Sequence, residues 1–188
     1  MNASNNWQDN PVELGKMKIL IIDDEPVNVA LLEEILLENS YSRVESVIDS
    51  THALDVCQTF QPDLVLLDLM MPPPDGFCIL ESLSAEHHTF LPIVVLTADT
   101  NPESRRRALE AGATDFLLKP FDHIEVALRI RNLLRSRRAH ILVDNQRAAL
   151  EDAVRDRTSE LRATIAALEK NVDPVWRGRE LPTISAGS

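Results

Sequence analysis

The sequence predicts an α/β fold with a doubly wound, five-stranded parallel sheet, a (βα)5 arrangement. From Lys16 onward, short apolar runs alternate with longer amphipathic runs, which is the pattern of parallel strands joined by crossover helices. Three of the five short runs are nearly all apolar, as strands buried on both faces are. A chain of 188 residues with 44% hydrophobic residues has room for one ordinary domain and an appendage.

Five strands and five helices are expected in alternation along the chain. The expected strands are Lys18–Ile22, Arg43–Val47, Leu64–Leu67, Ile93–Leu96 and Asp115–Leu118. The expected helices are Pro26–Asn39, Ser50–Phe60, Gly76–Leu83, Pro102–Ala111 and a last one that begins near Asp122. Asn101 is a candidate N-cap for the fourth helix because Pro102 suits a first-turn position, and Ser50 is a candidate cap for the second.

The buried face of the helices follows from their apolar spacing. In the first helix, we expect the inner stripe to comprise Val27, Ala30, Leu31, Ile35 and the Leu at 36 or 37. Cys57 and Cys78 lie in apolar segments without a CxxC or a nearby pair of His, so buried thiols are expected rather than a disulfide or a zinc site.

The last helix is too long for an ordinary globular helix. No Gly or Pro occurs from Asp122 to Lys170, and half of the seam positions in one heptad register are apolar. This pattern predicts a two-stranded coiled coil and therefore a homodimer. The seam positions are Leu133, Ser136, His140, Val143, Arg147, Leu150, Val154, Arg157, Leu161, Thr164, Leu168 and Asn171.

Charge and hydropathy exclude several classes of protein. The formal net charge is −11: residues 1–120 carry 20 Asp and Glu against 7 Lys and Arg (−13), and residues 121–188 carry 10 against 12 (+2). An acidic first part disfavours nucleic-acid binding because a polyanion is repelled. No apolar run approaches the roughly 20 residues that span a bilayer, and residues 1–11 lack the features of a secretory signal, so a cytoplasmic protein is expected.

Polar side chains follow four of the expected strands, at the edge where the strands end. Asp23 and Asp24 follow the first strand, Asp68 the third, Thr97 the fourth and Lys119 the fifth. Ligands of open parallel sheets bind at this edge, and three neighbouring carboxylates repel one another unless a cation lies between them. Their hard oxygen atoms favour Mg2+, while Thr97 and Lys119 suit a phosphoryl group beside Asp68.

Four motifs in order resemble the receiver domain of bacterial two-component response regulators, a CheY-like, flavodoxin-like fold. They are IIDDEPVN (Ile21–Asn28), LVLLDLMMPPPDG (Leu64–Gly76), VVLTAD (Val94–Asp99) and GATDFLLKPF (Gly112–Phe121). The resemblance covers about Lys16–Arg135. Together with the heptad pattern and with two Pro and two Gly after Asn171, it gives the expected division: a flexible segment at 1–15, a receiver at 16–135, a coiled-coil helix at 136–171 continuous with the last receiver helix, and a disordered tail at 172–188.

The resemblance also implies a role for each site residue. Asp68 is the expected phospho-acceptor, Asp24 a direct metal ligand, and Asp23 a second acid that acts largely through water. The backbone carbonyl of Met70 is expected to add a metal oxygen, and the Lys119–Pro120 bond is expected to be cis. The roles of the remaining residues concern the phosphoryl group and the switch: Thr97 and Lys119 are expected to hold the phosphoryl oxygens, Phe116 to be the switch aromatic, and Met70 and Asp99 to tune the phosphate's lifetime.

The implied mechanism is transfer of a phosphoryl group from a phosphohistidine of a histidine kinase, or of a phosphotransfer protein, to Asp68 with Mg2+. The modified Asp68 is expected to attract Thr97 and to let Phe116 turn inward, which reshapes the surface formed by the fourth helix, the fifth strand and the fifth helix. Phe116 lacks the hydroxyl of the commoner Tyr, so packing alone is expected to discriminate between the two states. His87 and His88 are expected in an exposed loop.

The output of the protein is left open by the sequence. Asn145–Lys170 resembles the linker helix that joins receivers to HD-GYP phosphodiesterase domains, but no HD, GYP or GGEEF motif follows. The expectation is a signalling module rather than an enzyme, whose effector has either been truncated from a longer regulator or is a separate partner recruited by the coil. A helix-turn-helix output is disfavoured because nothing breaks the helix between Leu133 and Pro174.

Two other classes of protein are alternatives to a phosphorelay module. A Mg2+-dependent phosphohydrolase of the haloacid dehalogenase type also uses a strand-end Asp, but it requires DxD, and Asp68, Leu69 and Met70 lack the second acid. A structural adaptor whose receiver is no longer phosphorylated is the third possibility, although all five site groups are present.

Overall fold

Five parallel strands form a single sheet in the computed structural model, which describes residues 14–86 and 90–171. The order is β2-β1-β3-β4-β5, with β1 and β3 paired at the centre. The expected strands are confirmed, and β3 and β4 each run one residue further, so that they end on Asp68 and Thr97. The strands are β1 (Lys18–Ile22), β2 (Arg43–Val47), β3 (Leu64–Asp68), β4 (Ile93–Thr97) and β5 (Asp115–Leu118).

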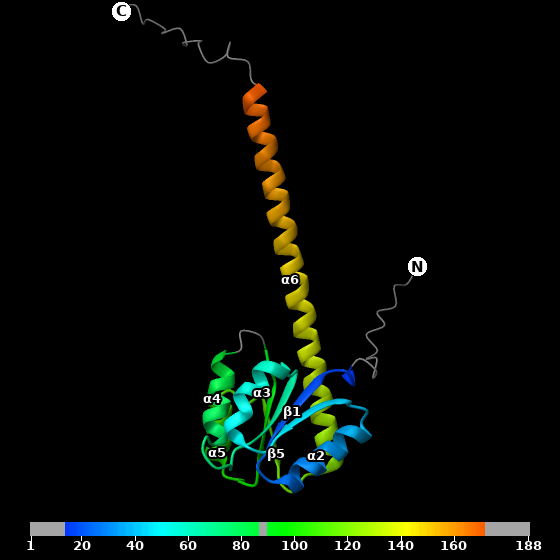
Figure 1. Ribbon diagram of the computed structural model, residues 1–188, viewed down its shortest axis with the longest axis vertical. Coiled ribbons are helices and arrows are strands. Elements are labelled where there is room, and N and C mark those ends of the chain that lie inside the picture. The colour runs from blue at the N-terminus through cyan, green and yellow to red at the C-terminus, as the bar shows by residue number, and fades with distance from the viewer. Residues whose placement is uncertain (1–13, 87–89, 172–188) are drawn as a thin grey trace, which may run out of the picture. The chain divides into compact units, whose positions relative to one another are not determined.

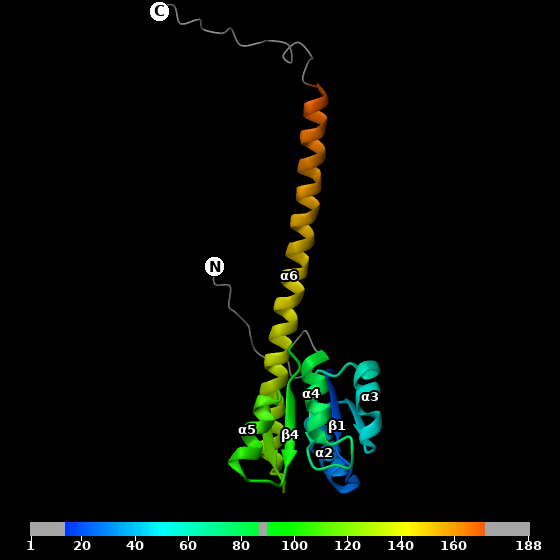
Figure 2. The same cartoon turned by 90° about the vertical axis from the view of Figure 1, so that its left-hand side faces the viewer.

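Helices cover both faces of the sheet (Figures 1 and 2). They are α2 (Pro26–Glu38), α3 (Ala53–Phe60), α4 (Gly76–Glu86), α5 (Pro102–Glu110) and α6 (His123–Asn171), with a short 3-10 helix, η1 (Ser50–His52), before α3. Successive side chains of a strand point to opposite faces, so each central strand contributes to two cores. One core joins the sheet to α2 and α6, and the other joins it to α3, α4 and α5.

The inner stripe of α2 matches the expected one only at Ile35 and Leu36. Its buried residues are Val29, Leu32, Ile35 and Leu36. Val27 and Leu37 are instead 79% and 74% exposed. Apolar residues lie nearly all round this helix, so its spacing permits two stripes, and only the packing against the sheet selects one.

Ser50 does not cap the second helix, which was a wrong expectation. The segment begins as η1, and its cap is Asp49, whose carboxylate accepts a hydrogen bond from the Thr51 amide. The Ser50 hydroxyl instead donates to the Pro72 carbonyl oxygen at 3.0 Å, which ties η1 to the loop after β3. The expected cap of α5 is confirmed, because Asn101 accepts from the Glu103 amide and Pro102 opens the helix.

The two cysteines lie in different environments. Cys57 is buried in α3 as expected, whereas Cys78 is exposed, so the prediction of a second buried thiol was wrong. The inward positions of α4 are taken by Ile79, Leu80 and Leu83, and position 78 therefore faces outward.

Packed residues occur on both sides of the expected receiver segment. Leu14 is buried in the α2/α6 core, and the Gly15 carbonyl accepts from the Ser42 amide. The first compact unit extends to Leu142. Arg137 contributes to it, because its guanidinium donates to the Phe90 carbonyl and lies 3.7 Å from Asp63.

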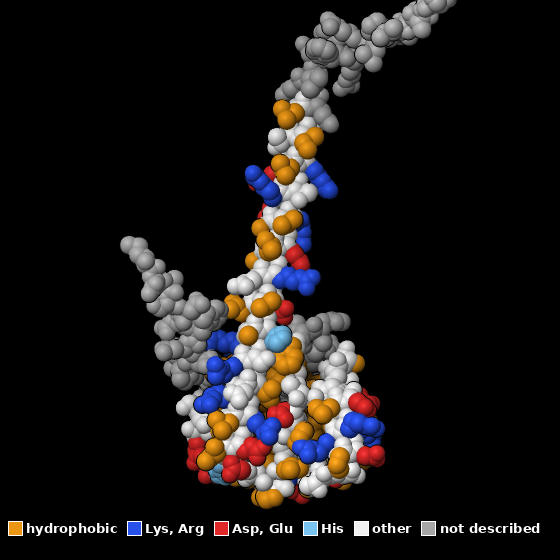
Figure 3. All heavy atoms as spheres, turned by 180° about the vertical axis from the view of Figure 1, so that it is seen from behind, with side chains coloured by type: hydrophobic (Ala, Val, Ile, Leu, Met, Phe, Trp, Pro, Cys, Tyr) orange, Lys and Arg blue, Asp and Glu red, His pale blue; other side chains and the backbone are white. Residues whose placement is uncertain are grey.

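The second unit begins at Val143 and contains the rest of α6. Large hydrophobic side chains recur along this part of the helix and are exposed (Figure 3). They are Val143, Leu150, Val154, Leu161, Ile165 and Leu168. Within the described residues, no helix is both long and apolar enough to cross a membrane. The expectations for residues 1–13, His87, His88 and residues 172–188 concern segments outside the described residues.

Candidate functional site

The strand ends bring the five expected polar groups to one edge of the sheet. Asp23 and Asp24 directly follow β1, Asp68 and Thr97 are the last residues of β3 and β4, and Lys119 directly follows β5. Since β1, β3, β4 and β5 are consecutive neighbours in a parallel sheet, their carboxyl ends meet at this edge. Asp23, Asp68 and Thr97 are buried, with 0%, 3% and 5% of their surfaces exposed.

The ammonium of Lys119 joins two of the carboxylates. Its Nζ lies 2.6 Å from Oδ2 of Asp68 and 2.9 Å from Oδ2 of Asp23. Burial by itself lowers the pKa of Lys119, but the hydrogen bonds and charges of Asp68 and Asp23 outweigh it and raise the pKa above its usual value. Lys119 is therefore a stable cation between two buried acids, and the Lys119–Pro120 bond after it is cis, as expected.

Asp23 is saturated with hydrogen bonds. Besides Lys119, it accepts from the Glu25 amide at 3.0 Å and from Nδ2 of Asn28 at 3.1 Å and 3.2 Å. The motif Ile21–Asn28 ends on Asn28, for which the sequence predicted no role. Its position in the first turn of α2, five residues after Asp23, was the signal that it reaches back to the strand end.

Asp24 differs from its neighbour, because its Oδ1 is buried and has no hydrogen-bond partner. One oxygen from each of Asp23, Asp24 and Asp68 lies within 4.8 Å of the others. An orphaned buried carboxylate oxygen is costly unless a cation or water satisfies it. Three hard oxygen donors, one of which has no hydrogen-bond partner, fit a divalent cation such as Mg2+.

The loop after β3 fixes the orientation of Asp68. The Met70 amide donates to Oδ1 of Asp68 at 3.1 Å, while the Met70 side chain is 74% exposed. Gly76 packs so closely on this loop that an added Cβ would overlap the carbonyl oxygen of Asp68 and the Cα of Leu69. A glycine is required here because the start of α4 touches the backbone that carries Asp68.

Thr97 is tied to the loop that leads into α5. Its Oγ1 accepts from the Asp99 amide at 2.9 Å, and Asp99 in turn accepts from the Asn101 amide at 2.8 Å. Hydrogen bonds from the Ser104 hydroxyl and the Asn101 amide lower the pKa of Asp99, which is exposed and stays ionised. The hydroxyl hydrogen of Thr97 remains available to an acceptor at the carboxyl end of the sheet.

Phe116 is half-buried on β5 and has a cation on its ring. The Arg105 guanidinium carbon lies 3.6 Å from the ring centroid. The sequence did not single out Arg105, whose contact with the ring has an electrostatic part besides packing. Only the helical position of Arg105, eight residues after Thr97, hints at it.

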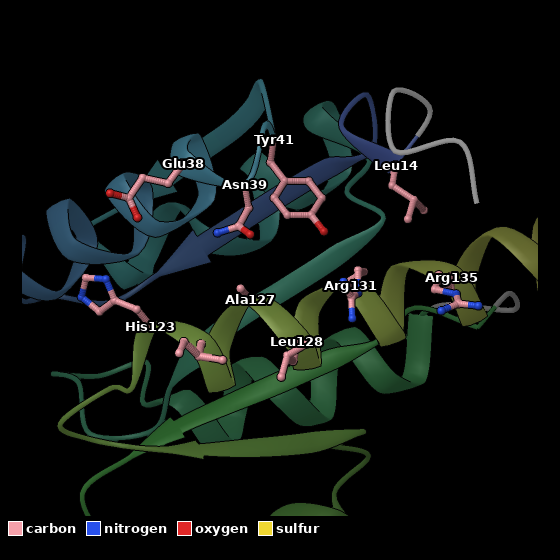
Figure 4. A pocket seen from close by; sticks show the side chains of 10 residues that line it. Leu14, Glu38, Asn39, Tyr41, His123, Ala127, Leu128, Arg131 and Arg135 are labelled. Atoms are coloured by element: carbon pink, nitrogen blue, oxygen red, sulfur yellow. The ribbon is translucent and has the colours of Figure 1, made fainter. Parts of the chain in front are cut away.

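A separate hollow of about 710 Å³ lies between α2 and the first turns of α6, and away from the acidic edge (Figure 4). Tyr41, Arg131 and Arg135 line it. Burial raises the pKa of Tyr41, and the nearby charge of Arg131 offsets only part of the rise. None of the five strand-edge residues contributes to this hollow.

A 2-1-3-4-5 parallel sheet with an acidic cluster and a Lys at its carboxyl edge defines a protein of the doubly wound signal-receiver class. Comparison with known proteins gives the same result: residues 19–131 match the family described as the response regulator receiver domain. The chain belongs to this family and carries the receiver domain of a two-component response regulator, a non-enzymatic signalling domain whose family mechanism is phosphorylation on Asp. Receiver domains bind Mg2+ at their acidic site and interact with histidine kinases or phosphotransfer proteins.

Three relatives illustrate the match. A probable cyclic di-GMP phosphodiesterase of Vibrio cholerae is 32% identical over 150 residues, which are 79% of this chain and 34% of that protein. The response regulator PleD of Caulobacter vibrioides is 40% identical over 119 residues, or 63% of this chain and 26% of that protein. The receiver domain of the Francisella response regulator 1452 has 27% identity and a TM-score of 0.60, with 64% of this chain and 98% of that one covered.

The chain therefore spans only part of the length of these curated relatives. The match to the phosphodiesterase covers 150 residues, whereas only 131 residues lie before the end of the receiver match. The phosphodiesterase match therefore extends further along α6 than the receiver match does.

Proposed function

We propose that the chain is a phosphorylation-switched module of a two-component phosphorelay, which accepts a phosphoryl group on Asp68. The observation that carries the proposal is Lys119, whose ammonium contacts Asp68 and Asp23 beside the unpartnered Oδ1 of Asp24. Phosphoryl transfer needs a nucleophilic carboxylate, a fixed cation and a carboxylate oxygen that is free to bind a metal ion, and this site has all three.

Asp23, Asp24, Asp68 and the Met70 carbonyl would hold the metal ion, and Asp24 offers the carboxylate oxygen with no competing hydrogen bond. When bound, Mg2+ neutralises the negative charge that develops on the transferring oxygens. Asp23 contributes a charge that Asn28 and the Glu25 amide hold in place, which agrees with a role through water.

Asp68 is the nucleophile in the proposed reaction. A carboxylate oxygen forms a bond to the phosphorus of a phosphohistidine as the phosphorus–nitrogen bond breaks, and the partner's histidine leaves. Lys119 and the Thr97 hydroxyl donate to the phosphoryl oxygens of the resulting aspartyl phosphate. Met70 and Asp99 flank the group and are proposed to affect its lifetime.

The proposed switch couples Thr97 to Phe116. A phosphoryl group on Asp68 attracts the Thr97 hydroxyl, and Phe116 then turns inward, which changes the surface of α5, β5 and the start of α6. Modification selects a conformation that the protein already visits as a minor state.

The proposed phosphoryl donor is a histidine kinase or a phosphotransfer protein, and the proposed location is the cytoplasm, where kinases have ATP. The chain is proposed to have only self-phosphorylating and self-dephosphorylating chemistry. The state of the receiver would reach an effector, either in a longer form of the chain or in a separate protein, through α6.

The exposed stripe of α6 supports a homodimer. Val143, Leu150, Val154, Leu161 and Leu168 occupy heptad seam positions and are each more than half exposed in one copy. A second copy of the same helix would cover them in a parallel coiled coil. Arg147 and Arg157 also lie on this seam, so the pairing is weaker than in an all-apolar zipper.

The test is incubation with acetyl phosphate and Mg2+, followed by intact mass spectrometry. We expect one added phosphoryl group on the wild-type chain, none on Asp68→Ala, and none when EDTA replaces Mg2+. Wild-type protein that stays unmodified would instead indicate an adaptor. Steady turnover of a small phosphate ester without a retained adduct would indicate a hydrolase.

A further inference from the structure

We propose that Arg105 is a positioning residue for Phe116, which holds the ring in its half-exposed position until Asp68 is phosphorylated. The inference rests on the proposed function. It goes beyond that proposal by assigning control of the switch to a cation on α5 rather than to packing. The observation behind it is the 3.6 Å separation of the Arg105 guanidinium carbon and the Phe116 ring centroid.

The contact is possible only while one face of the ring is near the surface. Arg105 and Phe116 are both intermediate in exposure, so the guanidinium keeps water on one side and the ring on the other. A guanidinium is costly to bury without a counter-charge, and it does not follow a ring into an apolar core. The contact therefore favours the half-exposed ring over a buried one.

The space beside the ring agrees with this assignment. Thr97, Arg105, Ala108 and Phe116 line one small cavity, together with Leu69, Val95, Asp99 and Ser104. Its free volume of about 10 Å³ has room for roughly one water molecule and not for an aromatic ring. Phe116 enters this region only if Thr97 and the start of α5 move, and Arg105 is attached to that part of α5.

A chain of hydrogen bonds connects the phosphoryl-binding hydroxyl to Arg105. Thr97 Oγ1 accepts from the Asp99 amide, the Asp99 carboxylate accepts from the Asn101 amide, and the Asn101 carbonyl accepts from the Arg105 amide. A shift of Thr97 toward Asp68 pulls on Asp99 and hence on the first turn of α5. The same movement that opens space for the ring draws the cation away from it.

Removal of the cation should make the phosphorylated conformation easier to reach. A phosphoryl mimic that binds that conformation then pays a smaller conformational cost, and its apparent affinity rises. A cation–π contact at a half-exposed site corresponds to roughly a two- to fivefold change in the equilibrium. The direction of the change in affinity is informative, because a substitution that merely damages the structure weakens binding of the mimic rather than strengthening it.

The experiment measures the apparent dissociation constant of beryllofluoride in the presence of Mg2+ for the full chain. We expect Arg105→Met to bind roughly two- to fivefold more tightly than wild type. Arg105→Lys keeps a cation and should lie nearer to wild type. Arg107→Met is the matched control on the same helix, because Arg107 makes a similar contact at 4.0 Å with Phe77 of α4 rather than with Phe116, and the affinity of this variant should be unchanged.

A double-mutant cycle isolates the pair. In a Phe116→Leu background, Arg105→Met should no longer change the affinity, since the ring is gone. Equal or weaker binding by Arg105→Met, or the same gain in the Phe116→Leu background, would overturn the inference and leave the proposed function intact. A wild-type chain that does not bind beryllofluoride at all would overturn both.

Discussion

The ammonium of Lys119 lies 2.6 Å from the carboxylate of Asp68, although 51 residues separate them in the chain. The parallel sheet makes this contact possible, because β3 and β5 flank β4 and end at the same edge. The same ammonium also reaches Asp23 at 2.9 Å, at the end of β1. One cation thus ties together three strand ends, which is why its removal is informative.

Replacing Lys119 with Met should destabilise the fold when Mg2+ is absent. Asp23 and Asp68 are buried and keep their other hydrogen bonds, but loss of their shared cation leaves two like charges without a counter-charge, at a cost of about 3 kcal/mol. Added Mg2+ should then raise the melting temperature more in this variant than in wild type. Calorimetry with and without Mg2+ measures both effects. Lys16→Met, at an exposed lysine, should change neither, and equal melting temperatures for Lys119→Met and wild type would contradict the prediction.

Gly76→Ala should disturb the backbone that carries Asp68. The new Cβ meets the Asp68 carbonyl oxygen and the Leu69 Cα, which are main-chain atoms that cannot rotate away. We expect a loss of about 2 kcal/mol in the free energy of unfolding, measured by urea titration. Cys78→Ala, an exposed position on the same helix, should change it by less than about 0.5 kcal/mol. A neutral Gly76→Ala would show that the loop after β3 is more compliant than its packing implies.

Tyr41 should ionise above the ordinary pKa of a tyrosine, which is about 10. Burial raises the pKa of Tyr41, and Arg131 offsets the rise only in part. The folded state therefore holds its proton more tightly than the unfolded state. The corresponding stability is fully present below the unfolded pKa and is lost as the pH rises through the folded one. Tyr41 is the only tyrosine in the sequence, so phenolate absorbance reports it directly. A midpoint at or below 10 would be incompatible with this account.

Leu161→Glu should convert the proposed dimer into a monomer. Leu161 lies on the α6 seam and is 53% exposed in one copy, so two glutamates would face each other in the coiled coil. Light scattering after size exclusion measures the mass. Ala166→Glu introduces the same charge on the opposite side of the helix and should leave the dimer intact. A monomeric wild-type chain, or equal loss of the dimer in both variants, would contradict a dimer formed through the seam positions of α6.

The strands were predictable because most of the short runs are apolar and four of the five expected strands are directly followed by a polar residue. Asp68 and Thr97 illustrate this, since both were expected at strand ends and both lie there. The buried stripe of α2 was not predictable, because Val27 and Val29 are equally apolar and only the sheet distinguishes them. Ser50 was misread for a related reason, since its hydroxyl prefers the Pro72 carbonyl, a partner 22 residues away.

Contacts between side chains were harder to predict than positions. The charge pattern placed a lysine near three acids, but it could not say that Lys119 joins Asp68 to Asp23 and leaves an oxygen of Asp24 without a partner. The cation on Phe116 depends on the rotation of α5 about its axis. Local patterns specify that rotation poorly, because five of the nine residues of α5 are charged.

Peptide mapping of the phosphorylated protein decides whether Asp68 accepts the phosphoryl group. Wild-type chain is treated with acetyl phosphate and Mg2+, its acyl phosphate is trapped by borohydride reduction to homoserine, and the peptides are sequenced by mass spectrometry. The account predicts homoserine at position 68 and at no other position. Homoserine at Asp23 or Asp24, or an unreduced Asp68 in protein that carries the adduct, would contradict it.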